Sequence, residues 1–167
     1  MELTGRVVLI GIGATIVMDL WAIFRKQVFG VPSLDYALVG RWLGHMPGGM
    51  FVHAGIATVP RVRGETILGW TAHYMTGIVF AGLLLVLYGT DWADRPTLGP
   101  ALGFGILTAA IPFFVMQPGM GLGVAASRTP KPNAARLRTL VTHAVFGLGL
   151  YLSAWLLAHA QNGLAWR

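Results

Sequence analysis

The sequence has no cysteine among its 167 residues, and it has few charged residues. The lack of cysteine excludes disulfide bonds, iron–sulfur clusters, cysteine-based zinc sites and a thiol nucleophile. Charged residues make up 11% of the chain, whereas a soluble globular domain carries about 25%. This shortage argues against a soluble enzyme and against a disordered tail. The net charge of +6 comes without a basic stripe interleaved with aromatic residues, so we expect no nucleic-acid partner.

Four apolar stretches are long enough to cross a membrane: residues 7–24, 67–88, 98–116 and 140–158. A spanning helix needs about 20 mostly apolar residues, because no backbone polar group can stay unpaired in lipid. The four stretches together contain a single formal charge, that of Asp19. The sequence therefore predicts an all-α integral membrane four-helix bundle, with residues 1–167 as one transmembrane domain. The lipid bilayer is its expected partner, and a second copy or another membrane protein is a further possibility left open.

The distribution of Lys and Arg outside these stretches predicts the orientation of the chain. The segments 25–66 and 117–139 contain five and four of these residues, which makes nine, whereas only Arg6, Arg95 and Arg167 lie elsewhere. Cytoplasmic loops carry the excess of positive charge in membrane proteins. We therefore expect 25–66 to be a long cytoplasmic loop and 117–139 a second one, with both termini on the periplasmic side.

The long loop 25–66 contains a further helical pattern. Ser33 can cap a helix over residues 34–46, which is mostly apolar but too short to span a bilayer. Pro47, Gly48 and Gly49 then interrupt the pattern. This segment is typical of an interfacial or re-entrant helix.

The spans also indicate an internal duplication. His73 precedes Gly77 by four residues in the second span, and His143 precedes Gly147 by four in the last span. The pattern is that of two helical hairpins related by an axis along the membrane normal, an arrangement found in transporters. Because the chain holds 23 glycines, chance can also produce such a match.

Each span delivers one polar side chain to a similar depth near the cytoplasmic side: Asp19, His73, Gln117 and His143. Ionisable residues within spans are costly, so they usually face the bundle interior, where they are paired or functional. Asp19, His73 and His143 are a workable ligand set for Zn, Fe, Ni or Mn, with Gln117 or water completing the shell.

Three other uses of these residues stay open at the level of sequence. The two histidines could hold a haem iron from facing helices. The same groups could relay protons in a small transporter or permeation protein. They could also act only as hydrogen-bonding glue between helices, in a structural membrane partner without a ligand.

Common catalytic patterns are missing from the sequence. The segment 11–13 reads Gly-Ile-Gly but has no Gly-x-Gly-x-x-Gly continuation, so it does not predict a nucleotide loop. There is no Gly-x-Ser-x-Gly elbow for a hydrolase. The sequence therefore leaves enzymatic activity open.

Several strings follow one another in a characteristic order. They are GIGATIVMDLW at residues 11–21, PSLDYALVGRWLGH at 32–45, FVMQPGMG at 114–121, RTPKPN at 128–133 and THAVFGLGLY at 142–151. Together they resemble a family of small bacterial inner-membrane proteins known as a domain of unknown function. The resemblance covers nearly the whole chain and implies an integral protein of a bacterial inner (cytoplasmic) membrane. It carries over no catalytic residues.

Overall fold

The structure is a computed structural model in which residues 2–164 are described. Within that range, four helices are long and apolar enough to cross a membrane: Leu3–Phe29, Glu65–Tyr88, Leu98–Gly119 and Pro132–Ala160. Many of their outward side chains are large and apolar, such as Val86 at 80% exposure and Leu107 at 65%. The prediction of an all-α bundle with four candidate membrane-spanning helices is confirmed, and each helix extends beyond the apolar stretch that predicted it.

The chain folds into six α-helices joined by short helical turns within the described residues. The α-helices are α1 (Leu3–Phe29), α2 (Tyr36–His45), α3 (Glu65–Tyr88), α4 (Leu98–Thr108), α5 (Gln117–Gly119) and α6 (Pro132–Leu164). The turns are η1 (Met46–Gly48), η2 (Ile56–Thr58), η3 (Thr90–Ala93), η4 (Pro112–Met116) and η5 (Val124–Ala126).

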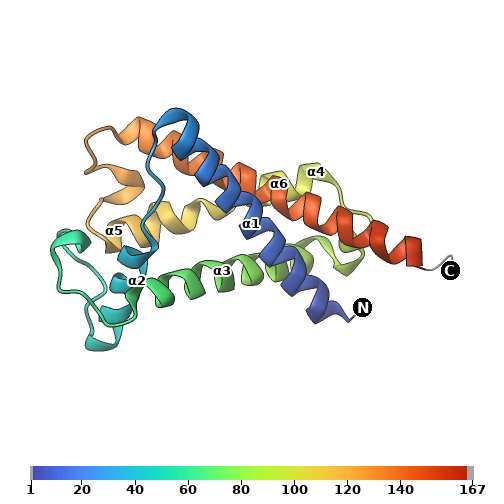
Figure 1. Cartoon of the computed structure of the whole chain (residues 1–167), viewed down its shortest axis with the longest axis horizontal. Coiled ribbons are helices and arrows are strands. Elements are labelled where there is room, and N and C mark those ends of the chain that lie inside the picture. The colour runs from blue at the N-terminus through green and yellow to red at the C-terminus, as the bar shows by residue number, and fades with distance from the viewer. Residues whose placement is uncertain (1, 165–167) are drawn as a thin grey trace.

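The long helices form a bundle in which α6 packs against both α1 and α4, while α1 also packs against α3 (Figure 1). Helices α3 and α4 make few contacts with each other. The beginning of α1 and the end of α6 lie at one end of the bundle, and α2 with the turn η5 lies at the other (Figure 1). The beginning of α1 and the end of α6 therefore fall on the same side, as an even number of membrane crossings requires.

Glycines set the closest helix contacts in both halves of the bundle. A Cβ atom on Gly77 of α3 would collide with Thr15 of α1, and one on Gly147 of α6 would collide with the backbone of α4 at Ala101. Small residues at helix interfaces allow such close approach in membrane proteins. Each His-x-x-x-Gly segment thus places its glycine against the long helix that precedes it in the chain.

The third span is interrupted, although the sequence pattern predicts one continuous helix over residues 98–116. The segment Pro112–Met116 is a π-helical turn between α4 and α5. Pro112 has no N–H to donate, and its ring crowds the carbonyl of the residue four positions earlier, so a regular helix cannot pass through it. Such π-turns are frequent at functional sites.

The segment between α1 and α3 differs from the expected long loop. Because α1 continues to Phe29 and α3 begins at Glu65, the connection is shorter than 25–66, and it contains α2. The expected helix over residues 34–46, capped by Ser33, is wrong at its start: α2 begins at Tyr36, and Asp35 caps it by accepting a hydrogen bond of 2.9 Å from the Ala37 N–H. A carboxylate is as good an N-cap as a hydroxyl.

Helix α2 packs closely on α3 at a pair of glycines. A Cβ atom on Gly40 would collide with the carbonyl of Glu65, and one on Gly69 would collide with the carbonyl of Tyr36. The two backbones are therefore in direct contact. Helix α2 is a packed element of the bundle end.

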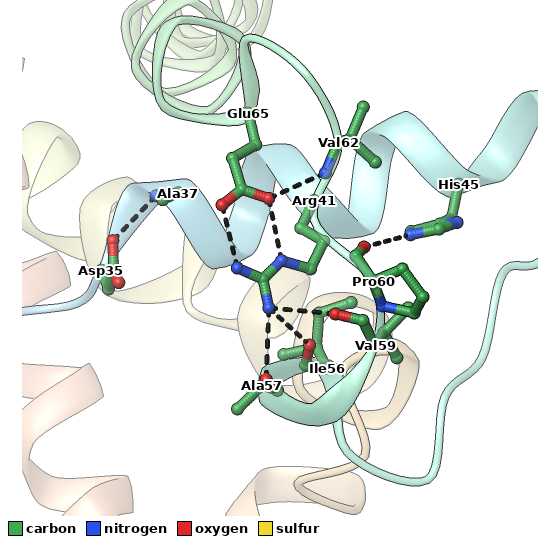
Figure 2. Close-up of polar contacts among 10 residues, drawn as sticks. All are labelled: Asp35, Ala37, Arg41, His45, Ile56, Ala57, Val59, Pro60, Val62 and Glu65. Atoms are coloured by element: carbon green, nitrogen blue, oxygen red, sulfur yellow. Dashed lines mark hydrogen bonds and ion pairs between the residues drawn. The ribbon is translucent and has the colours of Figure 1, made fainter.

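A buried ion pair fastens the rest of this connection (Figure 2). Arg41 of α2 makes two hydrogen bonds to the Glu65 carboxylate, of 2.8 and 2.9 Å. Its remaining nitrogen, Nη1, lies 3.2 Å from the Ala57 and Val59 carbonyls. Since only 5% of Arg41 is exposed, this guanidinium holds the loop after α2 against the beginning of α3.

Candidate functional site

A cavity of about 220 Å³ lies between the helices at the end of the bundle that carries α2. Its walls come from α1, α2, α3, the π-helical turn η4 and α6. The lining is mostly apolar, with Met18, Phe80 and Phe146 among its members, and it includes His73 and His143. A concave apolar site with a few convergent polar groups is the usual form of a small-molecule site.

His73 is the centre of a hydrogen-bond network on one wall of this cavity. Its Nε2 atom lies 2.9 Å from Oδ1 of Asp19 and 3.0 Å from the hydroxyl of Tyr36. The Tyr74 hydroxyl donates to the other carboxylate oxygen of Asp19 at 3.0 Å. The His73 and Asp19 side chains are only 11% and 16% exposed, so the network is largely shielded from outside.

The chemistry of these groups limits where their protons can lie. An ionised carboxylate only accepts, so Nε2–H of His73 donates to Asp19. The Tyr36 hydroxyl then keeps its own proton for another partner, and Tyr36 lines the cavity. If the pair takes up one more proton, Nδ1 of His73 carries a hydrogen as well, and transfer of the Nε2 hydrogen to Asp19 then leaves Nε2 as an acceptor for the Tyr36 hydroxyl. The Asp19–His73 pair can therefore hold its protons in more than one arrangement.

Tyr36 remains a hydrogen-bond donor at neutral pH. Burial raises the pKa of its phenol above the ordinary value, and the Asp19 carboxylate and the Tyr74 phenol raise this pKa further. Its ring lies against the imidazole of His73, with ring centroids 4.2 Å apart. Helix α2 thus supplies a neutral hydroxyl at a fixed place on the cavity wall.

His143 presents an acceptor to the same cavity. The Thr108 hydroxyl donates to the Gly105 carbonyl at 2.6 Å, and its oxygen lies 2.8 Å from Nδ1 of His143. Because the hydroxyl has one proton and the carbonyl takes it, Nδ1 of the imidazole must carry the hydrogen of the second bond. The other nitrogen, Nε2, is then an acceptor on a side chain that lines the cavity.

Gln117 lies apart from the other three predicted residues. It is buried at 7% exposure, but it does not line the cavity. Its amide nitrogen lies 3.4 Å from the Thr139 hydroxyl of α6, and its Oε1 atom has no hydrogen-bond partner within the described residues. The structure therefore brings Asp19 and His73 into contact and gives His73 and His143 a common cavity, but it leaves Gln117 outside.

The structure does not assemble the predicted three-residue metal set. Residues 2–164 contain no group of three or more His, Asp or Glu side chains placed to hold a metal ion. Asp19 is hydrogen-bonded to His73 and Tyr74. His143 is hydrogen-bonded to Thr108, which does not line the cavity. Asp19 is thus placed as a group that orients His73.

Comparison with known families identifies the chain. The family model described as "Protein of unknown function (DUF2938)" matches residues 8–157. The chain belongs to the DUF2938 family. The match covers all four spans except their outermost ends, so the cavity and its network lie inside the family region. No curated protein and no solved structure matches the chain at a significant level.

Three residues of the DUF2938 site were missed by reasoning from the sequence: Tyr36, Tyr74 and Thr108. A tyrosine hydroxyl buried in a bundle requires a polar partner, so Tyr74, which directly follows His73, could have been included. Tyr36 could not, because its place depends on how α2 packs on α3. Thr108 is one of many hydroxyl residues in the spans, and only the fold selects it.

Proposed function

We propose that this protein binds a small, largely apolar molecule carrying a hydroxyl or carbonyl group in the cavity, and couples its binding or passage to protonation of the Asp19–His73 pair. The observation that carries the proposal is that His73 and His143 line one cavity while His73 is hydrogen-bonded to Asp19. An intramembrane carboxylate beside an imidazole is the arrangement that proton-coupled membrane proteins use.

The chemistry of the lining supports this class of ligand. The apolar side chains favour a hydrocarbon or aromatic body. Tyr36 offers a hydroxyl proton, and Nε2 of His143 offers a lone pair. A ligand hydroxyl could donate to His143 and accept from Tyr36 at the same time. The few polar groups would thus fix the orientation of the ligand, as in other small-molecule sites.

The proposal also covers the membrane in which the bundle lies and its orientation there. We propose a bacterial inner membrane, with both termini in the periplasm and the segments 25–66 and 117–139 on the cytoplasmic side. The distribution of nine Lys and Arg on these two segments against three elsewhere supports this orientation. The cavity would then lie in the cytoplasmic half of the membrane, beside α2.

A second candidate is a transition-metal ion or haem held by His73 and His143, favoured by the fact that two imidazoles line a single cavity. Metal-bound histidines commonly donate their second N–H to a carboxylate, and Asp19 has that relation to His73. Two nitrogens are fewer ligands than the three or four of a zinc site, so the donor set is incomplete for a bare zinc ion. Metal content and an absorption spectrum of the purified protein separate this candidate from the first.

The proposal can be tested by identifying what the cavity holds when the protein is isolated. Small molecules are extracted with organic solvent from purified wild-type protein and identified by mass spectrometry. Ala72→Phe fills the cavity, because Ala72 lines it, whereas Val79→Phe on the same helix is a matched control at a position that is 57% exposed. We expect one compound that wild type and Val79→Phe retain and Ala72→Phe loses. Identical extracts from the three proteins would contradict the proposal.

A further inference from the structure

A second hollow lies between α1 and α6 and is lined by two arginines. It measures about 220 Å³, and its lining includes Trp21, Arg25 and Phe29 from α1 together with Leu137 and Arg138 from α6. The end of α1 and the beginning of α6 run side by side here, at the end of the bundle that carries η5 (Figure 1). None of the residues that line it belongs to the cavity with His73 and His143.

The two arginines are an uncompensated pair of positive charges. Neither forms an ion pair with an acidic residue within residues 2–164, where the salt bridges join Arg6 to Asp94, Arg41 to Glu65 and His73 to Asp19. Arg25 is directed toward α6 by a hydrogen bond of 3.3 Å from its Nη1 to the Thr142 hydroxyl. Two like charges beside one hollow repel each other, and an anion between them would remove this repulsion.

Two enclosed N–H groups beside the hollow have no acceptor. They are Nε of Arg25 and Nε1 of Trp21, both shielded from solvent and without a hydrogen-bond partner among the described residues. A buried donor without a partner is costly. The hollow therefore combines positive charge with unused hydrogen-bond donors, which is the chemistry that binds a phosphate oxygen.

The walls around the arginines are suited to hydrocarbon. Phe29 and Leu137 are each 62% exposed, and Val141 is 37% exposed. They lie next to the charges on the outer surface of two spanning helices. From this combination we propose that the hollow between α1 and α6 binds an anionic phospholipid, with its phosphate between Arg25 and Arg138 and an acyl chain along Phe29, Leu137 and Val141. Basic pockets between membrane helices bind anionic headgroups elsewhere.

The proposal is tested by lipid retention in native mass spectrometry of the detergent-solubilised full chain. Dioleoyl phosphatidylglycerol and dioleoyl phosphatidylcholine are added separately, so that only the headgroup differs. Wild type should retain the anionic lipid in preference to the neutral one. Each arginine near a membrane surface strengthens binding of anionic lipid by about fivefold, so the double variant Arg25→Gln/Arg138→Gln should bind phosphatidylglycerol roughly 25-fold more weakly.

Matched variants keep the test specific. Arg61→Gln/Arg63→Gln removes the same charge from exposed positions of another loop and should retain phosphatidylglycerol as wild type does. Arg25→Lys/Arg138→Lys keeps both charges and should restore much of the binding. Equal retention by wild type and the Arg25→Gln/Arg138→Gln variant would overturn the proposal, and so would an equal loss in the Arg61→Gln/Arg63→Gln control. Full competition by inorganic phosphate would also overturn it, because the site would then take a free anion.

Discussion

The Nε2 atom of His73 lies 2.9 Å from Oδ1 of Asp19, and this contact joins α3 to α1 beside the cavity. Asp19 carries the only formal charge in the four apolar stretches of the sequence. Its second oxygen accepts a hydrogen bond from the Tyr74 hydroxyl. The charge is therefore fully engaged by neighbours, and it determines how protons are arranged around His73.

Substitution of Asp19 should separate hydrogen bonding from charge. Asp19→Asn keeps the size and an acceptor, and hydrogen bonds in membrane proteins average about 0.6 kcal/mol, so its cost in stability should be small. Asp19→Leu leaves the partly buried His73 and Tyr74 donors unpaired, which costs up to about 1–3 kcal/mol. Thermal unfolding in detergent should therefore rank wild type, Asp19→Asn and Asp19→Leu in that order. An unchanged melting temperature in Asp19→Leu would show that the contact does not hold α1 to α3.

Close packing of α2 on α3 should fail when a methyl group is added between them. Gly40→Ala places a Cβ atom against the Glu65 carbonyl, which cannot move without shifting α3. We expect a lower melting temperature and faster proteolysis of the segment after α2. Gly103→Ala in α4 is the matched control, since nothing lies within 4 Å of its added Cβ atom. That substitution should be neutral or stabilising by about 0.5–1 kcal/mol, because alanine is the better helix former.

The buried ion pair of Arg41 and Glu65 should be far more important for stability than the pair of Arg6 and Asp94, in which the carboxylate is mostly exposed. Arg41→Met leaves the Ala57 and Val59 carbonyls without this donor and the Glu65 carboxylate with only the Val62 N–H. The melting temperature should fall markedly, because removing one member of a buried ion pair leaves the other charge buried without its counter-charge. Asp94 is 58% exposed, so Asp94→Asn should change stability by no more than about 1 kcal/mol. Similar effects of the two substitutions would argue against the clamp shown in Figure 2.

The orientation of the bundle can be measured with reporters at its ends. Since the beginning of α1 and the end of α6 lie on the same side (Figure 1), both termini should report the same compartment. An alkaline phosphatase fused after Arg167 should be active, as expected of a periplasmic C-terminus, and a fluorescent reporter inserted after Gly49 in the connection after α2 should mark the cytoplasm. A cytoplasmic C-terminus would reverse the proposed position of the cavity in the membrane.

Composition and periodicity were sufficient to predict the spans, because a lipid environment leaves so few alternatives for a long apolar segment. The interior position of Asp19 and His73 followed from the cost of exposing them to lipid. The details of the site did not follow. Tyr36 reaches His73 only because α2 packs on α3 through Gly40 and Gly69, and this contact between distant segments has no local signal.

Gln117 shows a different limit of the sequence pattern. If the helix that begins at Leu98 were regular, the face on which Gln117 lies could be predicted from the sequence. The π-helical turn Pro112–Met116 instead adds a residue to one turn and changes the direction in which the next side chains point. Gln117 accordingly contacts Thr139 of α6 and lies outside the cavity. The prediction of a continuous helix took no account of Pro112, which disturbs a regular helix but whose position alone does not give the geometry of the turn.

The central claim is that the cavity recognises an apolar molecule through the hydrogen-bonding groups of its walls, and ¹⁹F NMR tests it most directly. Saturable binding of 4-fluorophenol and of fluorobenzene is compared in nanodiscs with and without the protein. The two probes share an apolar ring, and only 4-fluorophenol has a hydroxyl. One net hydrogen bond of about 1 kcal/mol should make 4-fluorophenol bind roughly fivefold more tightly than fluorobenzene. In the double variant Tyr36→Phe/His143→Leu this preference should disappear, because the hydroxyl and the imidazole that would bond the phenol are both lost, and in Ala72→Phe neither probe should bind. Equal binding of both probes to the wild-type protein, or a preference that survives in Tyr36→Phe/His143→Leu, would contradict the account.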